Sequence, residues 1–399
     1  MSKPALKVHV LASPLQGQST GELLGPVVAG FRERAGLELI PLGEGEADDS
    51  PLLSVLLLTG GTERKLVELA ARRPGPVLVL THPAQNSLAA GLEAVARLKR
   101  DGRRVVLYHL GGGRRGAEPG TLVRAVELAR FLRGTRVGLI GEPSPWLVAS
   151  VPDEAALRDK LGLELVRIPL SEVLSRVPSQ APPVAGPGEG IGPAERAIGP
   201  RVEAALSGLV EDYRLDAFTI ACFGLLPHGL TACWALARLA DRGIPAGCEG
   251  DLVGLVALLF AQGITGGPGF LANPVDVDPK GERLLLAHCT VPLSLTQGYL
   301  LRTHFESGIG LAVAGELSPG PYTLVRLGGK RLEQLFAVEG TVLPEQPRRE
   351  DLCRTQAVFK APRGALEKLL SEPLGNHHVL IPGHHRALLT AFHGLFLAE

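Results

Sequence analysis

The sequence predicts an α/β protein with two Rossmann-like, parallel-sheet α/β domains followed by a β-rich, barrel-like domain. Up to about residue 268, short apolar runs of strand length alternate with longer segments of helical periodicity. Beyond that point the pattern changes to short strands separated by frequent turns. A chain of 399 residues, 45% of them hydrophobic, is long enough to bury several cores. We therefore predict domains over residues 1–134, 135–268 and 269–399.

A repeated rhythm of strands and helices predicts the N-terminal domain. Strands and helices alternate there in the order 54–58, 63–72, 77–80, 88–99 and 105–107. Helical crossovers make such a sheet parallel, and its ligands bind at the carboxyl ends of the strands. Thr59, His82 and Asn86 lie in those loops and are predicted to bind substrate, although ordinary turn chemistry explains such loops equally well.

The central domain repeats the α/β pattern. Strands are predicted at 137–141, 163–168 and 217–222, and helices at 194–213, 231–242 and 252–262. The Pro/Gly-rich stretch from Pro178 to Pro200 excludes regular helix and interior strand, which predicts an exposed loop or lid.

The C-terminal domain is predicted to be mostly antiparallel, because its strands are short and separated by turns. Strands are predicted at 283–288, 310–315, 322–327, 334–339, 356–360 and 379–381, with a closing helix at 386–397.

Composition excludes several classes of protein. Lys+Arg and Asp+Glu both number 41, so no basic field is available to hold nucleic acid or an anionic membrane. The first ten residues lack the apolar core of a signal peptide. The sequence also contains no run of about 18 apolar residues, the length that a membrane-spanning helix requires. We expect a cytoplasmic protein. The five cysteines show no CxxC spacing, which argues against both a disulfide framework and a thiolate zinc site and predicts buried thiols.

Asparagine is rare enough to direct attention to its positions. The chain has three: Asn86, Asn273 and Asn376. Each can serve as a turn or cap residue, but all three lie in segments that also carry other candidate site residues. We predict that Asn376 binds substrate and that Asn273 takes part in catalysis.

Glu249 is the strongest single acidic candidate. It lies in a glycine-flanked segment between a predicted strand and an apolar helix, whose N-cap we assign to Asp251. Glu249 has no capping role from its position, which favours a metal ligand or a general base.

Four of the eleven histidines lie within nine residues near the C-terminus. Because adjacent strand residues point in opposite directions, His377 and His378 are not expected to bind one ion together. His384 and His385 are expected to be exposed at the start of the last helix. His288 ends a predicted strand and is a candidate ligand only in the company of others.

His304 and Glu306 alternate with Phe305, so we expect them to share one face of a strand as an acid/base pair.

Four segments in order, Cys248–Asp251, Phe270–Asn273, Leu286–Cys289 and Gly375–His378, give the chain a resemblance to the L-fucose/L-arabinose isomerase family. The resemblance implies a fucose isomerase-like fold and a trimer or hexamer with sites at subunit interfaces. It also implies conversion of an aldose to a ketose through an ene-diol, assisted by a divalent ion, commonly Mn²⁺. The implied substrate is a small sugar or polyol.

The same resemblance implies roles for individual residues. Glu249 matches the first ligating carboxylate, His377 the terminal histidine, and His288 an additional histidine ligand; His378 then remains for substrate binding. The position of the second carboxylate is occupied by Asn273, whose amide can ligate a hard ion or orient substrate but cannot act as a base. Asp276 and Asp278 are possible substitutes, although Pro274 and Pro279 favour a turn in which they bind the backbone.

Two other functions remain compatible with these residues. The chain could be a sugar-binding or regulatory relative without a complete acid/base pair. It could also be a metal-dependent hydrolase or lyase acting on a small polyol, which requires the metal but only one base.

Overall fold

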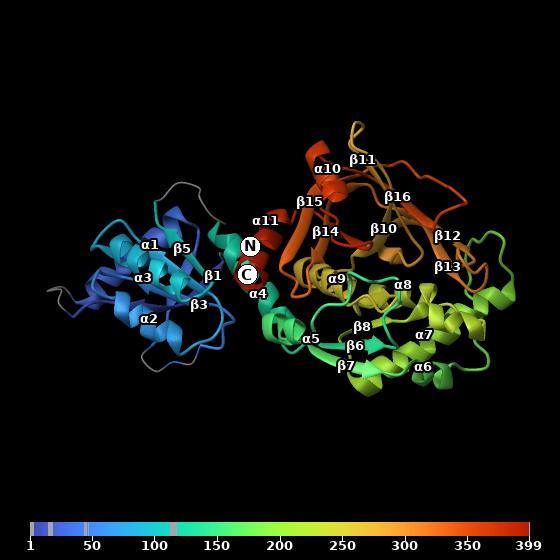
Figure 1. Ribbon diagram of the computed structural model, residues 1–399, viewed down its shortest axis with the longest axis horizontal. Helices are drawn as coiled ribbons and strands as arrows, with labels where there is room; N and C mark the ends of the chain where they lie inside the picture. Colours follow the sequence, from blue (N-terminus) through green and yellow to red (C-terminus); the bar gives the residue numbers. More distant parts are fainter. Residues whose placement is uncertain (1–3, 15–18, 44–45, 47, 112–117, 399) are drawn as a thin grey trace. The chain divides into compact units, whose positions relative to one another are not determined.

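The computed structural model describes residues 4–14, 19–43, 46, 48–111 and 118–398 (Figure 1). Two compact units are present: Met1–Phe131 with Ala387–Ala398, here unit 1, and Leu132–Arg386, here unit 2. Each unit is described by itself. The division into three domains stays a prediction.

Unit 1 contains a five-stranded parallel sheet in the order β2-β1-β3-β4-β5. The elements are β1 (Ala5–Leu11), α1 (Thr20–Arg34), β2 (Glu38–Pro41), β3 (Leu53–Leu57), α2 (Glu63–Ala71), β4 (Val77–Thr81), α3 (Ser87–Arg100), β5 (Val105–His109), α4 (Pro119–Leu132) and α11 (Arg386–Phe392). All residues of β3 and β4 are buried, as expected for central strands that are covered on both faces. The predicted parallel sheet is confirmed, and the structure adds β1, β2, α1 and α4.

Unit 2 begins with a second parallel sheet, in the order β7-β6-β8-β9. Its elements are β6 (Arg136–Ile140), α5 (Glu154–Ala156), β7 (Glu164–Ile168), α6 (Leu170–Arg176), α7 (Pro193–Tyr213), β8 (Ala217–Ile220), α8 (Cys233–Asp241), β9 (Ala246–Cys248) and α9 (Leu252–Thr265). Helix α7 begins at Pro193, one residue before its predicted start, because proline is well tolerated in the first turn of a helix; Pro200 therefore lies inside α7 and not in the predicted loop.

A closed antiparallel barrel follows, in the order β10-β11-β16-β15-β14-β17. Its strands are β10 (Phe270–Asp278), β11 (Arg283–His288), β14 (Gly320–Gly328), β15 (Gln334–Val342), β16 (Thr355–Lys360) and β17 (His378–Pro382). The hairpin β12 (Thr296–Arg302) and β13 (Ala312–Leu317) and the helix α10 (Arg363–Ser371) accompany it. The prediction of an antiparallel, barrel-like region is confirmed; its likeness to the fucose isomerases stays a prediction.

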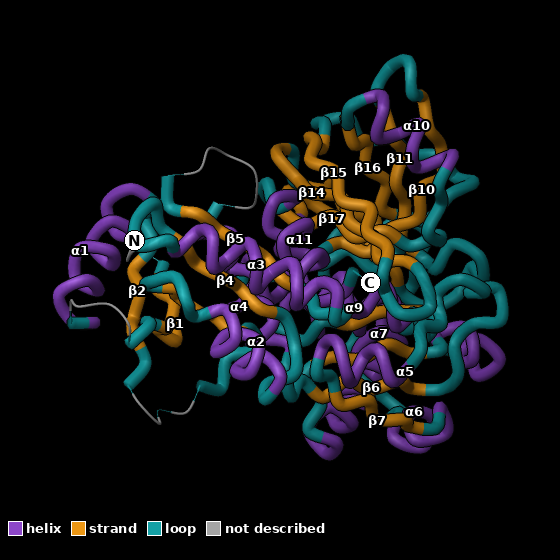
Figure 2. Tube along the Cα trace, turned by 60° about the vertical axis from the view of Figure 1, so that its left-hand side comes forward, coloured by secondary structure: helices purple, strands orange, loops and turns teal. Residues whose placement is uncertain are grey.

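Helix α9 is the centre of unit 2. It packs against β8 and β9 of the parallel sheet and against β14 and β17 of the barrel (Figures 1 and 2). Its residues Leu252–Ala261 are all buried, which explains why this segment is hydrophobic all round. The N-terminus of α9 therefore lies where the parallel sheet of unit 2 meets the barrel.

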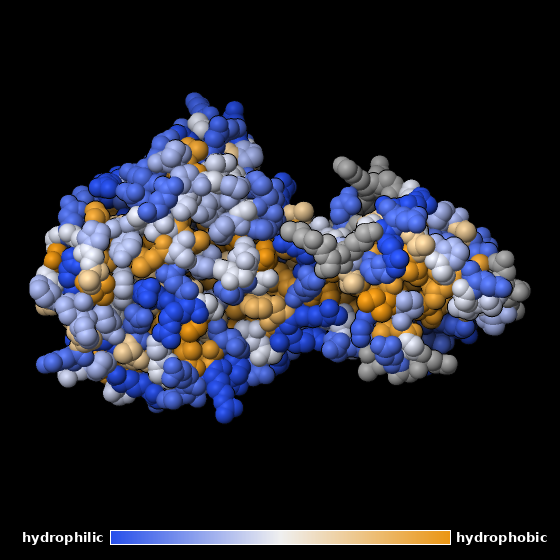
Figure 3. All heavy atoms as spheres, turned by 180° about the vertical axis from the view of Figure 1, so that it is seen from behind, coloured by the Kyte–Doolittle hydropathy of each residue, from blue (hydrophilic) through white to orange (hydrophobic). Residues whose placement is uncertain are grey.

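The outer surface follows the usual rule for globular proteins. Hydrophilic residues cover most of the face seen in Figure 3, with apolar residues scattered among them. Within the described residues, no helix is long and apolar enough to cross a membrane.

Candidate active site

A tight turn, Cys248–Asp251, connects β9 to α9 and forms the base of the site. Glu249 and Gly250 have φ angles of 62° and 70°, and the Asp251 backbone N–H donates to the Cys248 carbonyl at 3.1 Å. Positive φ at both central residues is the pattern of a type I′ turn. A left-handed conformation costs a non-glycine residue about 1–2 kcal/mol. The fold sustains that strain at Glu249, a pattern typical of functional sites.

Close packing also requires glycine at position 250. A Cβ atom there would lie 2.7 Å from Pro143 Cα and 3.1 Å from Pro143 N, both backbone atoms that cannot yield easily. The turn is further tied to its surroundings by the Gly250 N–H, which donates to Ile220 O at 3.0 Å, and by the Ser144 N–H, which donates to Glu249 O at 2.8 Å.

Glu249 is held at the edge of the site. Its side chain accepts a hydrogen bond from Trp146 Nε1 at 2.6 Å, and its other oxygen lies 3.7 Å from His377 Nε2. Glu249 is 8% exposed and Trp146 is 51% exposed, so the carboxylate lies just beneath the surface. The Trp146 ring also meets Phe223 edge-on, with centroids 5.0 Å apart.

His377 is completely buried, and Asp251 fixes its orientation. His377 Nδ1 lies 2.9 Å from Asp251 Oδ2, while its Nε2 finds no hydrogen-bond partner among the described residues. Burial favours the neutral form of Asp251, but the hydrogen bond with His377 and then the charge of Arg326 outweigh it and lower the Asp251 pKa. With Nδ1–H donating to the carboxylate, a neutral imidazole presents the lone pair of Nε2 to the site.

Arg326 completes this buried network. Its side chain is 1% exposed and donates to Asp251 Oδ2 at 3.2 Å, to the His377 carbonyl at 2.7 Å and to Ser150 Oγ at 2.6 Å. Asp251 also accepts from the Gly254 N–H at 2.7 Å, which confirms the predicted N-cap of α9.

His288 approaches His377 from the end of β11. Its Nδ1 lies 2.8 Å from Thr290 Oγ1 and its Nε2 lies 3.4 Å from Cys248 Sγ. The two imidazole rings meet edge-on, with centroids 5.5 Å apart. Burial, followed by the charge of His377, lowers the pKa of His288 to about 4, so His288 is neutral near pH 7.

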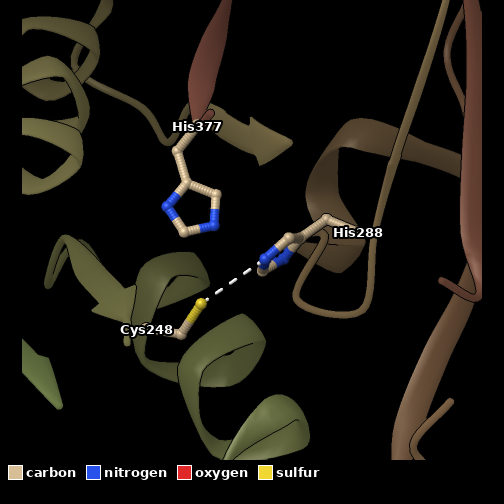
Figure 4. Close-up of side chains that lie close together, drawn as sticks. All are labelled: Cys248, His288 and His377. Atoms are coloured by element: carbon tan, nitrogen blue, oxygen red, sulfur yellow. Dashed lines mark hydrogen bonds between the residues drawn. The ribbon is translucent and has the colours of Figure 1, made fainter. Parts of the chain in front are cut away.

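Donor atoms of Cys248, His288 and His377 all lie within 4.8 Å of one another, and their side chains converge (Figure 4). The cysteine thiol is buried, and its contact with Cys222 together with burial raises its pKa well above the usual value. A neutral imidazole, a second imidazole with an unused lone pair and a thiol form a donor set that fits a metal ion.

A second acid/base group, formed by His304 and Glu306, belongs to the same region. Their Nε2 and Oε2 atoms lie 2.9 Å apart, and the His304 ring meets Phe223 with centroids 5.8 Å apart. The pair forms on a turn, so its expected place on one face of a strand is wrong. The turn is stabilised by the Gly308 N–H, which donates to the His304 carbonyl at 2.9 Å.

Asn273 lies on β10, opposite Ala287 in the register with β11 and one residue after Ala272, the partner of His378. The expected turn is found only after Asp278, over residues 279–282, whereas at Asp276 it is wrong, because β10 continues to Asp278 through a bulge after Pro274.

Neither aspartate has the environment of a replacement carboxylate. Asp276 is exposed and faces Arg349 at 3.9 Å. Asp278 accepts from the Gly281 N–H at 3.0 Å.

The other predicted substrate-binding residues of unit 2, Asn376 and His378, line a separate cavity of about 380 Å³ beside β10 and α10. His378 packs edge-on against Phe336 of the barrel core, on the opposite side of the strand from His377. The alternation predicted for this pair is therefore present. Substrate binding by Asn376 and His378 stays a prediction.

Three predicted substrate-binding residues lie in unit 1. Thr59 Oγ1 accepts from the Ser13 N–H at 2.8 Å, and His82 Nε2 lies 2.9 Å from the Leu58 carbonyl. Asn86 is exposed before α3 with φ 57°, a conformation that asparagine tolerates. These contacts account for the residue types, and their role toward substrate stays a prediction.

Sequence reasoning missed three residues of the site, Cys248, Trp146 and Arg326. It also missed that Asp251, besides capping α9, orients His377. Arg326 did leave a signal, because it is the one charge in the apolar run of β14. A lone arginine in a buried strand requires a buried acidic partner. The sequence does not say which carboxylate that is.

The site combines a carboxylate, two imidazoles and a thiol at the carboxyl end of a parallel strand. Such a set defines a class of site suited to proton transfer and metal-assisted chemistry. No protein-family model matches the chain.

The chain is similar to sulfoquinovose isomerases. It is 23% identical over 297 residues to that of Alkalicoccus urumqiensis, covering 66% of this chain and 63% of the relative. It is 24% identical over 295 residues to that of Priestia megaterium, covering 66% and 64%. The chain thus spans less than two thirds of the length of these relatives. The similarity agrees with the expected class of sugar isomerases.

We predict that Gly250→Ala destabilises unit 2 more than Gly229→Ala does. Both glycines have φ near 70°, but a Cβ at Gly229 meets no atom within 4 Å. Gly229→Ala is expected to cost about 1–2 kcal/mol from backbone strain. Gly250→Ala adds a clash of about 1–3 kcal/mol. Urea denaturation measures both, and equal losses would contradict the packing requirement at Pro143.

Asp251→Ala is predicted to cost about 3–5 kcal/mol, because it leaves the Arg326 charge buried and unpaired. The control is Asp153→Ala, which removes an N-cap bond to Ala155 N from an exposed residue and is expected to cost about 1 kcal/mol. Equal midpoints in urea would mean that Asp251 acts as a cap alone.

The His304–Glu306 pair predicts a pH-dependent contribution to stability. Burial lowers the His304 pKa, but the hydrogen bond with Glu306 outweighs it and raises the pKa above 6.5. The hydrogen bond with His304 lowers the Glu306 pKa below 4.5. The pair therefore contributes its full stabilisation between pH 4.5 and pH 6.5, the ordinary pKa values of Glu306 and His304. It is lost as pH rises through the raised His304 pKa, or falls through the lowered Glu306 pKa.

Because Glu306 is 43% exposed, solvent screens the pair, and we expect Glu306→Gln to cost at most about 1 kcal/mol at about pH 6 and less at about pH 9. Glu316→Gln is the control, since Glu316 is 42% exposed and pairs with Arg348, which does not titrate in this range. A cost for Glu306→Gln that is the same at both pH values would contradict the assignment.

Proposed function

We propose that the chain is an aldose–ketose isomerase of a sugar, working through an ene-diol. The observation that carries the proposal is the strained, nearly buried Glu249 carboxylate, set 3.7 Å from the unused Nε2 of His377. The similarity to sulfoquinovose isomerases supports the reaction class, and a sulfonated sugar is accordingly one of the substrates to test.

The reaction needs a base that removes the proton from C2 of the aldose and returns it to C1, while a second proton moves from the C2 hydroxyl to the C1 carbonyl oxygen. Glu249 is suited to the first task. Its hydrogen bond from Trp146 fixes one oxygen at 2.6 Å and leaves the other facing His377.

His377 and His288 would hold a divalent ion, manganese in the family that the chain resembles. Such an ion polarises the sugar carbonyl and the neighbouring hydroxyl. Asp251 keeps His377 in the ligating tautomer, and Thr290 orients His288. Both histidines present buried nitrogen atoms to one region without competing strong hydrogen bonds.

The His304–Glu306 pair is our candidate for the second proton transfer, because Asn273 cannot accept a proton. Phe223 contacts both Trp146, the partner of Glu249, and His304, the partner of Glu306. The two glutamates therefore belong to neighbouring groups of side chains that share one aromatic ring. The charges of Glu306 and His304 also act on the pKa of His288, which places the pair within electrostatic reach of the cluster.

A sugar-binding protein without catalysis is the second candidate. Asn273, in the place of a ligating carboxylate of the resembling family, favours it. The fold and the sugar-binding residues would then be kept while proton transfer is lost. Homo-oligomerisation, implied by the resemblance, belongs to both candidates.

The test is an assay of the purified protein, supplied with divalent ions, against a panel of aldoses that includes sulfoquinovose. Reactions in deuterated water report proton transfer, because the proton returned to C1 exchanges with solvent. Glu249→Gln is expected to lower kcat by about 10²–10⁴-fold with a small change in KM.

The matched control is Glu203→Gln, since Glu203 accepts from Trp234 Nε1 at 3.0 Å, another Glu–Trp pair. Its kcat should stay within about twofold of that of the unmodified protein. Ligand-induced thermal stabilisation without turnover or solvent exchange would overturn the isomerase and favour the binding protein.

A further inference from the structure

The thiol of Cys248 lies where a third metal ligand would be expected. Its Sγ is 3.4 Å from His288 Nε2, and its donor atom lies within 4.8 Å of those of both histidines. Two ligands of one tetrahedral zinc ion, with Zn–S of about 2.3 Å and Zn–N of about 2.0–2.1 Å, are separated by about 3.6 Å. The sulfur–nitrogen distance thus matches that of two ligands of one ion.

An independent observation points to a ligand in the same place. His377 Nε2 is buried, has no hydrogen-bond partner among the described residues and faces Cys248 and His288 (Figure 4). Leaving a buried nitrogen without a hydrogen-bond partner is unfavourable, because the atom has lost its contact with water. Asp251 prevents the ring from using Nδ1 instead, since that atom is already bound at 2.9 Å.

Both imidazoles have the supporting contacts typical of metal ligands. His377 is oriented by the carboxylate of Asp251 and His288 by the hydroxyl of Thr290. Carboxylate–histidine pairs fix the tautomer of a ligating ring and raise its basicity. The Asp251 carboxylate is in turn bound by Arg326, so the arrangement is rigid.

Donor chemistry then selects the ion. Sulfur and nitrogen donors suit zinc, whereas manganese prefers carboxylate, carbonyl and water oxygens. Among the described residues, the one group of His, Cys, Asp and Glu side chains with metal-binding spacing is Cys248, His288 and His377.

We propose that Cys248, His288 and His377 form a three-ligand site for a borderline-soft divalent cation, zinc, that Cys248 ligates as the thiolate after its proton is released to solvent on metal binding, and that Glu249 remains unligated beside it. Three protein ligands leave one position open, which is the arrangement of catalytic zinc sites. The absence of CxxC spacing predicted no thiolate zinc site. The proposed site has one cysteine and ligands from three separated segments, an arrangement for which CxxC spacing is no guide.

The catalytic meaning of this site rests on the proposed function, since the open position lies next to Glu249. With Cys248 as the third ligand, the Glu249 carboxylate is free to move protons. Its distance of 3.7 Å from His377 Nε2 places it beside the cation site.

The experiment uses the full-length protein, stripped of metal with a chelator and titrated with Co²⁺, Zn²⁺ and Mn²⁺ separately. Cobalt bound by the unmodified protein should show thiolate-to-cobalt charge-transfer absorption in the near ultraviolet and the intense visible bands of tetrahedral cobalt. This measurement requires no variant. Cobalt bound without the charge-transfer band would overturn the proposal, as would failure to bind one equivalent.

Variants then identify the ligand. Cys248→Ser should abolish the charge-transfer band and weaken Zn²⁺ binding by more than about tenfold, with a smaller effect on Mn²⁺. Cys353→Ser is the matched control, because Cys353 is a half-buried cysteine outside the three-residue group. This variant should keep both the charge-transfer band and the affinity for Zn²⁺. Equal losses in the two variants would refute the role of Cys248.

Glu249→Gln separates this inference from the proposed function. It should retain the cobalt spectrum and zinc stoichiometry while isomerisation is lost. Stoichiometric zinc bound through Cys248 in a protein that isomerises no aldose would reject the proposed function and keep the zinc site. Loss of the metal in Glu249→Gln would reject the unligated role given to Glu249.

Discussion

The buried carboxylate of Asp251 is the interaction on which the rest of the site depends. One oxygen caps α9 through the Gly254 N–H, while the other binds His377 and faces Arg326. A charge at 0% exposure is stable only when its partners offset the cost of leaving water. The same contacts therefore begin the central helix, join it to the barrel and set the orientation of His377. Stability of unit 2 and chemistry at His377 share one set of atoms.

The turn before Asp251, in contrast, costs free energy instead of stabilising the fold. Glu249 adopts a conformation that costs free energy, and Gly250 is needed because any side chain would meet Pro143. Strand β9 and helix α9 are both packed, so the short connection between them has little freedom. In this turn the Glu249 side chain lies beside His377 and Trp146. This is the physical basis for giving Glu249 the role of base.

Much of the fold follows from periodicity, because strands and helices bury apolar residues at different intervals. The position of α9 and the cap at Asp251 were predicted correctly, as was the opposed orientation of His377 and His378. The expected strand at His304 was wrong, since two residues alternating with a phenylalanine also occur in turns. The expected turn at Pro274 was wrong as well, because a bulge lets β10 accommodate proline.

By itself the sequence determined which segments form most of the strands and helices and that Asp251, not Glu249, caps α9. Periodicity and capping act between near neighbours along the chain, so they can be read in order. Only the tertiary structure decided that Cys248 meets His288 and that Arg326 pairs with Asp251. Those contacts join residues 40 and 75 positions apart, and they depend on how the barrel closes against α9. No local pattern encodes that packing, since it results from the combined burial of both sheets.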